Sequence, residues 1–186
     1  LETNPARELT RRIAGGSEGG GRERVLTDDE LRTMWHWDSP HTPLLRTLLL
    51  TGLRIRELQL AKQKDFGGTD SKRHGVTGLE LVIPPEHSKN GKEHRVPILA
   101  LALGEVVFDE DNNAPLIPST TSPTAVQSAI KRWHEREGTK PWTPHDLRRT
   151  FATLLQRLGV PVETIQRCLY HTLEGTGSVY ARDGKV

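Results

Sequence analysis

The chain has 186 residues, a formal net charge of +2 and a single cysteine, Cys168. This length suits one domain with a hydrophobic core, and a lone cysteine excludes an intrachain disulfide, which fits a reducing cytosol. No apolar run approaches the length that crosses a membrane, and no signal peptide opens the chain. The weak net charge does not indicate a partner, so the distribution of charges matters more than their sum.

The first residues differ in composition from the rest. Residues 1–26 hold five glycines among Arg and Glu side chains and few large apolar groups, which is typical of a flexible linker. Leu1 stands where an intact chain has Met, which indicates a fragment that lacks an upstream domain. We therefore expect a linker over residues 1–26 and a folded domain over residues 27–186.

Most of the folded part has helical periodicity. Thr27 and Glu30 have the spacing of a capping box, which marks the start of the first helix. Thr143 as N-cap, Pro144 in the first helical position and Gly159 as terminator delimit a later one. The helices are predicted over residues 27–36, 43–50, 54–62, 123–137, 144–158 and 161–170.

The middle of the chain changes to strand-like patterns. Residues 79–83 and 94–98 are predicted strands, and Asn90-Gly91 between them is a strong hairpin signal. Lys89 would then lie at the edge of the turn, and residues 109–123 read as a loop. The expected fold class is α+β, mostly α-helical with a small antiparallel β-sheet.

The carboxyl-terminal half is locally basic. Residues 131–157 hold seven Lys or Arg side chains against three Asp or Glu, with two histidines added. A run of this kind is more often a solvated helix face than a nucleic-acid surface. The charge alone therefore leaves both interpretations open.

Within that segment, His145 and Arg148 form a candidate pair. They lie three residues apart near a helix start, so both project from one face, close to free backbone amides that favour an anion. The pair flanks an apolar stripe expected to face the core, which consists of Leu147, Phe151, Leu154, Leu155 and Leu158. The alternative is a surface histidine beside a salt-bridging arginine.

Two further cations, Arg54 and Lys89, have neighbours that favour a role at a phosphate. Arg54 precedes Glu57 by one turn, so the carboxylate can hold the guanidinium in a bidentate pair and leave other N–H groups for a phosphate. An ordinary i,i+3 salt bridge is the competing interpretation, and Arg56 lies on another face. Lys89 could protonate a leaving 5′ oxygen if nearby cations make it a stronger acid, although it could equally be a solubilising lysine, with Lys92 as a rival.

Near the end of the chain, His171 and Tyr180 lie nine residues apart. A phenol beside cationic donors is suited to covalent attack on a phosphodiester, because it supplies an oxygen nucleophile while the cations neutralise charge on phosphorus-bound oxygens. Taken singly, Tyr180 could be a packing residue and His171 a core-edge histidine. Zinc binding by His145 and His171 lacks Cys or carboxylate partners at ligand spacing.

The order of these groups resembles the tyrosine recombinase family, the phage-integrase class of site-specific DNA recombinases. Thr51 to Leu58 (Thr-Gly-Leu-Arg-Ile-Arg-Glu-Leu) matches the segment that carries the first arginine, and His145 to Arg148 matches the His-x-x-Arg box. In the family, a lysine in a β-hairpin lies seven residues before a Val-Pro pair. Counting back from Val96 in this sequence identifies that lysine as Lys89 and disfavours Lys92. Leu169-Tyr170-His171 replaces a Leu-Gly-His segment, and the nucleophile nine residues later is Tyr180.

The resemblance implies a mechanism for the catalytic domain of a prophage-type integrase. Tyr180 attacks the scissile phosphate to give a 3′-phosphotyrosine and a free 5′ hydroxyl, while Arg54 and Arg148 bind the non-bridging oxygens. Lys89 is the general acid and His145 the general acid/base toward the tyrosine. In addition, His171 donates a hydrogen bond to phosphate and Glu57 supports Arg54. The family needs no cofactor, neither ATP nor metal, because the covalent link conserves bond energy.

The implied partners are double-stranded DNA attachment sites and other integrase subunits, in a tetramer on DNA within the bacterial host cytosol and nucleoid, with no membrane. Three other interpretations stay open. The first is a type IB topoisomerase-like nicking-closing enzyme, which uses the same groups. The second is a non-catalytic DNA-binding module of the same fold. The third is an ordinary helical domain with coincidental motifs.

Overall fold

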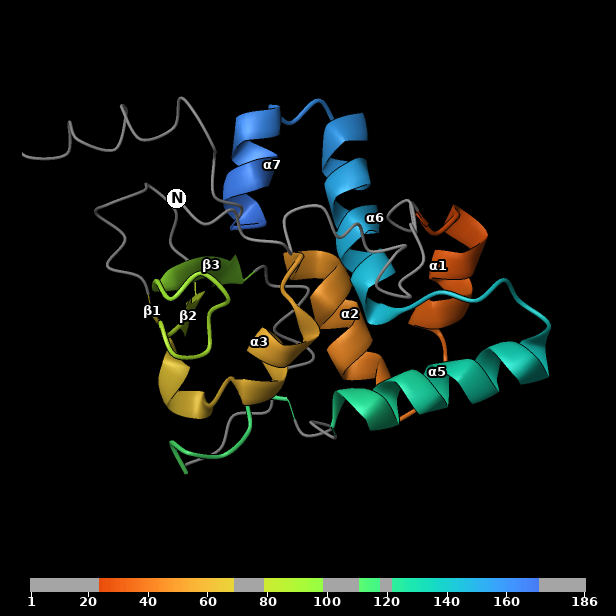
Figure 1. Ribbon diagram of the computed structural model, residues 1–186, viewed down its shortest axis with the longest axis horizontal. Coiled ribbons are helices and arrows are strands. Elements are labelled where there is room, and N and C mark those ends of the chain that lie inside the picture. The colour runs from red at the N-terminus through yellow and green to blue at the C-terminus, as the bar shows by residue number, and fades with distance from the viewer. Residues whose placement is uncertain (1–23, 69–78, 99–110, 118–121, 171–186) are drawn as a thin grey trace, which may run out of the picture.

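The computed structural model of the chain describes residues 24–68, 79–98, 111–117 and 122–170. Its elements, in chain order, are α1 (Asp28–Trp35), α2 (Thr42–Thr51), α3 (Ile55–Leu60), the 3₁₀ helix η2 (Gln63–Asp65), β1 (Phe66–Gly68), β2 (Leu79–Ile83), β3 (His94–Ile98), α5 (Pro123–Glu137), α6 (Pro144–Arg157) and α7 (Val162–Cys168) (Figure 1). The helices form the main body and the strands form one small sheet at its side. The predicted α+β class, mostly helical with a small antiparallel sheet, is therefore confirmed.

The amino-terminal helix begins as its sequence predicts. The Thr27 hydroxyl accepts from the Glu30 backbone N–H at 3.3 Å, and the Glu30 carboxylate accepts from the Thr27 backbone N–H at 2.9 Å. This reciprocal capping box satisfies donors that the first turn of a helix leaves free. Packing extends slightly further upstream, because Leu26 is buried and its N–H donates to the Thr150 hydroxyl of α6 at 3.0 Å.

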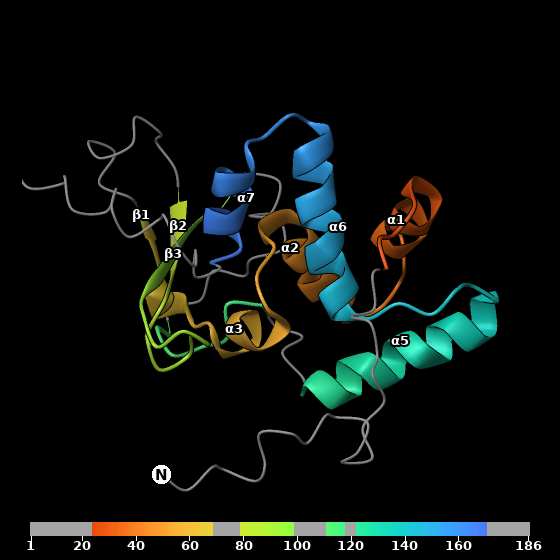
Figure 2. The ribbon, with the colours of Figure 1, turned by 45° about the horizontal axis from the view of Figure 1, so that its top comes forward.

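Helix α2 is the centre of the core. Its leucines Leu44, Leu45 and Leu48 are fully buried, and the helix packs along α6 in both views (Figures 1 and 2). The helix ends at Gly52, which has φ +66° and donates its N–H to the Leu48 carbonyl. The chain then turns directly into α3, so the Thr-Gly-Leu-Arg segment lies between two helices at the middle of the molecule.

The next helix is shorter than predicted. α3 ends at Leu60 and not near Lys62, because Ala61 has extended dihedral angles and its carbonyl accepts from the Leu116 N–H at 3.0 Å. Lys62 then forms an isolated antiparallel bridge with Pro115. The helix therefore ends early because Ala61 and Lys62 pair with residues more than 50 positions away in the chain.

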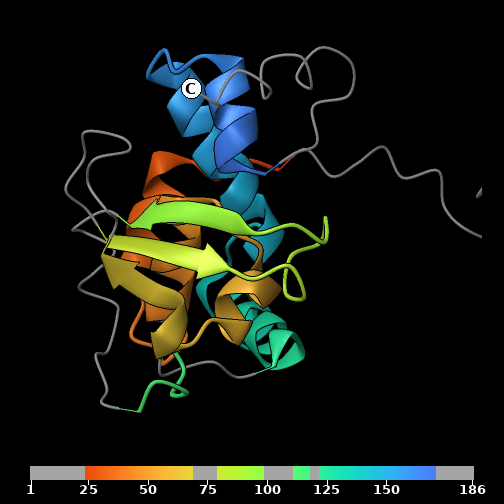
Figure 3. The ribbon, with the colours of Figure 1, turned by 90° about the vertical axis from the view of Figure 1, so that its left-hand side faces the viewer.

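The sheet has the order β1-β2-β3 and is antiparallel throughout. Along β3, His94, Val96 and Ile98 are buried while Arg95 and Pro97 are exposed, which is the alternation of a strand with one face on the core. Figure 3 looks onto the sheet, with the helices behind it. Strand β1 was not predicted, because its Phe-Gly-Gly sequence is short and has no alternating pattern.

The hairpin connection is longer than the Asn90-Gly91 pair predicts. β2 ends before Pro84 and Pro85, which cannot donate to a ladder, and β3 begins at His94. The turn within this connection closes when the Gly91 N–H donates to the Ser88 carbonyl at 3.2 Å. Asn90-Gly91 therefore occupies the second half of a turn inside a longer loop, and not a two-residue hairpin.

The last two helices follow the predicted bounds within a few residues. α6 has Thr143 as its N-cap, where both the backbone N–H and the hydroxyl donate to the Asp146 carboxylate at 2.8 and 2.9 Å. The predicted apolar stripe is wrong at Leu158, which is 79% exposed because it lies beyond the core at the end of the helix. Among the described helices, none has the length and apolar character needed to cross a bilayer.

Candidate active site

Arg148 is the most deeply buried of the described candidate cations. It is only 4% exposed, and its guanidinium donates to the backbone carbonyls of Gly52, at the end of α2, and Leu169, at the end of α7. These partners are 96 and 21 residues away in the chain. Arg148 is therefore no surface salt-bridging arginine: it joins the ends of two helices to the side of a third.

Arg54 lies at the N-cap of α3 and is half-buried. The buried carboxylate of Glu57 accepts from Arg54 Nη1 through Oε1 and from the Arg54 backbone N–H through Oε2, both at 2.9 Å. The pair is therefore not the bidentate grip on the guanidinium that we expected. One carboxylate oxygen holds the side chain and the other caps the helix, which leaves more of the Arg54 guanidinium available to a ligand.

The two guanidiniums lie close enough to influence each other. Burial lowers the pKa of Arg148 to about 10, and the positive charge of Arg54 acts in the same direction while Glu57 opposes it. Arg148 therefore remains charged at neutral pH, and the buried carboxylate that acts on it is Glu57, the partner of Arg54. Such a cluster has an excess positive charge in a partly desolvated place, which an anion would offset.

His145 and Arg148 lie at one pocket. This pocket has a volume of about 370 Å³ and is lined by Val25, His145, Arg148, Arg149, Ala152, Thr153 and Leu169. Burial lowers the pKa of His145 below its ordinary value, and the charges of Arg149, Arg148 and Arg54 lower it further, against Asp146. The neutral imidazole is therefore favoured, which is the form that accepts a proton.

The hairpin lysine lies in a loop that is fastened to the end of α7. Lys89 and its rival Lys92 are both exposed, so burial does not separate them. The adjacent Asn90 donates its side-chain amide to the Tyr170 carbonyl at 2.8 Å. Tyr170 in turn donates its hydroxyl to the Glu93 carbonyl at 2.9 Å.

A buried histidine that sequence reasoning missed lies beside this contact. His94, the first residue of β3, is 5% exposed and stacks on Tyr170, with ring centroids 4.3 Å apart and planes 10° from parallel. Burial lowers its pKa; Glu57 opposes this, and the charges of Arg148 and Arg54 add to it. The one sequence signal for His94 is the alternation along the predicted strand, which places its side chain on the buried face.

The remaining two candidates, His171 and Tyr180, lie outside the described residues. The chain has only one other tyrosine, Tyr170. Its hydroxyl is engaged with the Glu93 carbonyl, and burial, with a smaller contribution from Glu93, raises its pKa above the ordinary value. Tyr170 is thus held as a neutral hydrogen-bond donor, which is unsuited to nucleophilic attack.

The basic segment does not form one continuous cationic stripe. Several of its cations have acidic partners, in the pairs Lys131–Glu135 at 3.8 Å, Arg136–Glu137 at 2.7 Å and Arg149–Asp146 at 3.1 Å. His134 is a core residue: its Nε2 accepts from the Trp142 N–H at 3.0 Å, and its Nδ1 contacts the Thr139 hydroxyl. Within this segment, the candidate active-site residues are therefore the His145–Arg148 pair.

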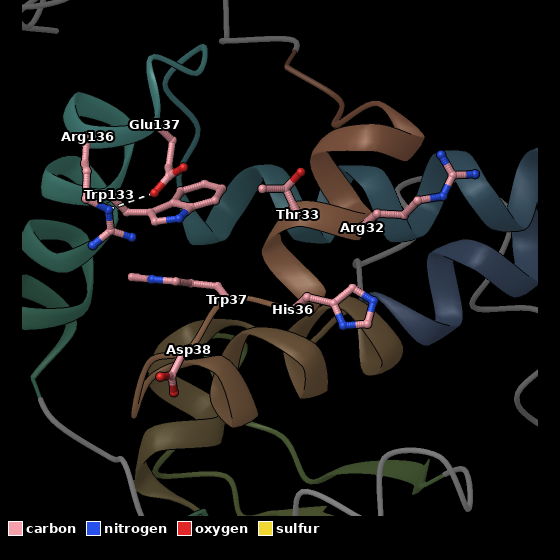
Figure 4. A pocket seen from close by; sticks show the side chains of 8 residues that line it. All are labelled: Arg32, Thr33, His36, Trp37, Asp38, Trp133, Arg136 and Glu137. Atoms are coloured by element: carbon pink, nitrogen blue, oxygen red, sulfur yellow. Dashed lines mark hydrogen bonds and ion pairs between the residues drawn. The ribbon is translucent and has the colours of Figure 1, made fainter.

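A second pocket lies away from this site, between α1 and α5. It has a volume of about 450 Å³, and Trp37 and Trp133 approach each other there with ring centroids 5.3 Å apart (Figure 4). None of the described candidate residues lines it. Across the described part of the chain there is also no group of three or more His, Cys, Asp or Glu side chains that could hold a metal ion.

Solved structures share this architecture. The catalytic domain of bacteriophage HP1 integrase matches with a TM-score of 0.58 and 17% identity, over 80% of each chain. The XerA recombinase matches with a TM-score of 0.57 and 24% identity, over 80% of this chain and 55% of its own. The fold is therefore that of a tyrosine recombinase catalytic domain.

The sequence comparisons lead to the family. The chain belongs to the phage integrase family, whose model matches residues 24–185. The tyrosine recombinase XerA of Pyrococcus horikoshii is 28% identical over 172 residues, covering 86% of this chain and 56% of that protein. An integrase/recombinase of Escherichia coli is 46% identical over 61 residues, covering 32% of this chain and 18% of that protein. The chain covers less than two thirds of the length of these relatives.

Proposed function

We propose that the chain is the catalytic part of a site-specific DNA recombinase that cleaves and rejoins DNA through a 3′-phosphotyrosine. The single observation that carries the proposal is the convergence of Arg54, Arg148 and His145, whose charges act on one another, with the buried Glu57 carboxylate holding Arg54. Two guanidiniums held together in a partly desolvated place are suited to the non-bridging oxygens of one phosphate. Family membership supports the same reaction.

The proposed division of labour assigns each group one task. Tyr180 attacks phosphorus and forms the tyrosine ester as the 5′ oxygen of the leaving strand departs. His145, in its neutral form, accepts the phenolic proton, and Lys89 donates a proton to the leaving oxygen. Arg54 and Arg148 stabilise the charge of the pentacoordinate transition state, with His171 as a further hydrogen-bond donor. Attack by a second 5′ hydroxyl reverses the steps and releases Tyr180.

The proposed partners are double-stranded DNA attachment sites and further integrase subunits, assembled as a tetramer on DNA in the host cytosol. Support comes from structural neighbours: XerH was solved bound to its difH substrate, and the Tn1549 transposon integrase in complex with transposon right end DNA. We further propose that residues 1–26 link the catalytic domain, residues 27–186, to a separate core-binding domain. The composition of the opening and the greater length of the relatives support this division.

The test is a suicide substrate, a nicked duplex whose short cleaved strand diffuses away and traps the covalent intermediate. The wild-type chain is expected to form a protein–DNA adduct, and Tyr180→Phe to form none while its circular dichroism is unchanged. A chain that binds such DNA without any adduct would be a non-catalytic module. Relaxation of supercoiled plasmid without sequence preference would instead support the topoisomerase-like alternative.

A further inference from the structure

Tyr170 occupies a backbone conformation that its side chain does not favour. Its φ of +51° lies in the left-handed region, and it is the one residue other than glycine with positive φ in the described part of the chain. A glycine adopts this conformation without steric cost, whereas a residue with a Cβ atom does not. Strain of this kind persists only where surrounding contacts hold the residue in place.

The ring, hydroxyl and carbonyl contacts of Tyr170 lead to the lysine hairpin, the loop over residues 84–93 together with His94, while its backbone N–H donates to the Arg167 carbonyl of α7. The phenol ring stacks on the buried His94, the hydroxyl donates to the Glu93 carbonyl, and the backbone carbonyl accepts from Asn90 Nδ2. Nδ1 of His94 is buried and has no hydrogen-bond partner among the described residues. The histidine ring is therefore held here by stacking and not by a hydrogen bond at Nδ1.

The same end of α7 is bound to the arginine centre, which consists of Arg54, Arg148 and Glu57. The carbonyl of Leu169, the residue before Tyr170, accepts from the buried guanidinium of Arg148. One short segment thus contacts Arg148 through Leu169 and the lysine hairpin through Tyr170. Lys89 immediately precedes Asn90, so its backbone is fixed relative to the arginines by these contacts.

We propose that Tyr170 is a positioning residue that fastens the lysine hairpin to the arginine centre and so delivers Lys89 to the leaving oxygen. This inference rests on the proposed function, because it assumes that Lys89 is the general acid. It adds a determinant that acts through another residue and does not itself touch DNA. The proposal concerns proton delivery, and it therefore predicts a defect that depends on the chemistry of the leaving group.

The experiment compares single-turnover cleavage of an ordinary suicide substrate with that of one carrying sulfur at the bridging 5′ position. A thiolate leaves without protonation, so this substrate does not need the general acid. Tyr170→Gly removes both the strain and the ring, and it is expected to slow cleavage of the ordinary substrate by at least about 10-fold. On the sulfur substrate its rate is expected to return to within about threefold of wild type.

A double-mutant cycle provides the second measurement. If Tyr170 acts through Lys89, Tyr170→Gly combined with Lys89→Ala is no slower than Lys89→Ala alone. Asn90→Ala, which removes one contact from the hairpin side and leaves α7 unchanged, is expected to show a smaller defect that the sulfur substrate also rescues. Lys92→Ala is the matched control and is expected to keep the wild-type rate on both substrates.

The outcomes separate the two proposals. If the wild type forms no adduct with either substrate, the proposed function fails. If the wild type cleaves and Lys89→Ala is slow but rescued, while Tyr170→Gly matches wild type, only the positioning role fails. A Tyr170→Gly defect that sulfur does not rescue, and that multiplies with that of Lys89→Ala, would show a general loss of structure and overturn the positioning role.

Discussion

Gly52 lies where the end of α2 closely approaches Phe151 of α6 and Leu169 at the end of α7. Its φ is +66°, and a Cβ placed there would lie 2.4 Å from Phe151 Cδ1 of α6 and 3.2 Å from Leu169 Cδ2. Its carbonyl also accepts from Arg148. Glycine is therefore required by conformation and by space, at the position that holds the buried arginine.

We expect Gly52→Ala to lower the free energy of unfolding by about 3 kcal/mol, from the left-handed conformation and the forced displacement of Phe151. Gly138→Ala is the matched control. That glycine has φ +63° but nothing within 4 Å of its added Cβ, so we expect a loss of about 1 kcal/mol. Urea denaturation of both variants measures the difference, and equal losses would contradict a close approach of α6.

The protonation of His145 predicts a pH profile. Because burial and the charges of Arg149 and Arg148 lower its pKa, the base form persists below the ordinary imidazole value of about 6.5. We expect the single-turnover cleavage rate to stay constant as pH falls from about 8 to 6.5 and to decline only below that. His145→Asn should be slow and lack this acidic decline. A wild-type rate that already falls above pH 7 would contradict the neutral imidazole.

At the scale of elements, Arg148 joins α2, α6 and α7 by bonding to carbonyls at two helix ends. A lysine has one compact ammonium and cannot reproduce the forked contacts. We expect Arg148→Lys to lower the free energy of unfolding by about 3 kcal/mol, since it leaves a buried carbonyl without a donor.

The neighbouring Arg149 supplies the comparison, because it is a partly exposed partner of Asp146. Arg149→Lys should cost less than about 1 kcal/mol. Thermal unfolding of the two variants in parallel checks the difference. Equal stability losses would mean that the buried contacts of Arg148 do not hold the three helices together.

The elements themselves were largely predictable, because local signals control them. The Thr27–Glu30 capping box and the Thr143 cap mark helix starts, and the alternation along residues 94–98 marks a strand. Predictions failed where distant residues decide. Ala61 leaves the helix because it pairs with Leu116, and the exposure of Leu158 depends on where the core ends.

Candidate residues for the site could be proposed from the sequence, but their geometry could not. The spacing of Arg54, Lys89, His145 and Arg148 identified candidate groups. Nothing in the sequence places the Arg148 guanidinium on carbonyls at the ends of two other helices. The stack of His94 on Tyr170 was equally hidden, because its two residues are 76 positions apart and only the fold brings them together.

At the scale of the whole molecule, the positive charge near the site is concentrated and not spread over a face. Arg54 and Arg148 act on each other and have one paired carboxylate, Glu57, beside them, whereas Arg136 and Arg149 each have an acidic partner of their own. The chain also covers only part of the length of its relatives. We therefore expect few phosphate contacts.

Binding to duplex DNA should accordingly be weak and sensitive to salt, with affinity falling at least about 10-fold between roughly 50 and 200 mM salt. Arg54→Ala should reduce the salt slope by about one, and Arg136→Ala should leave it nearly unchanged. Gel-shift titration across salt concentrations measures both. Tight binding that does not respond to salt would contradict this expectation.

The central claim is that a tyrosine near the end of the chain is joined to DNA beside the two arginines. Mass spectrometry of the proteolysed, nuclease-trimmed adduct tests it most directly, because the chain has only two tyrosines and they fall at separable positions. We predict that the nucleotide is attached to Tyr180 and that the Tyr170 peptide is unmodified. Attachment to Tyr170, or to a residue other than tyrosine, would contradict the account.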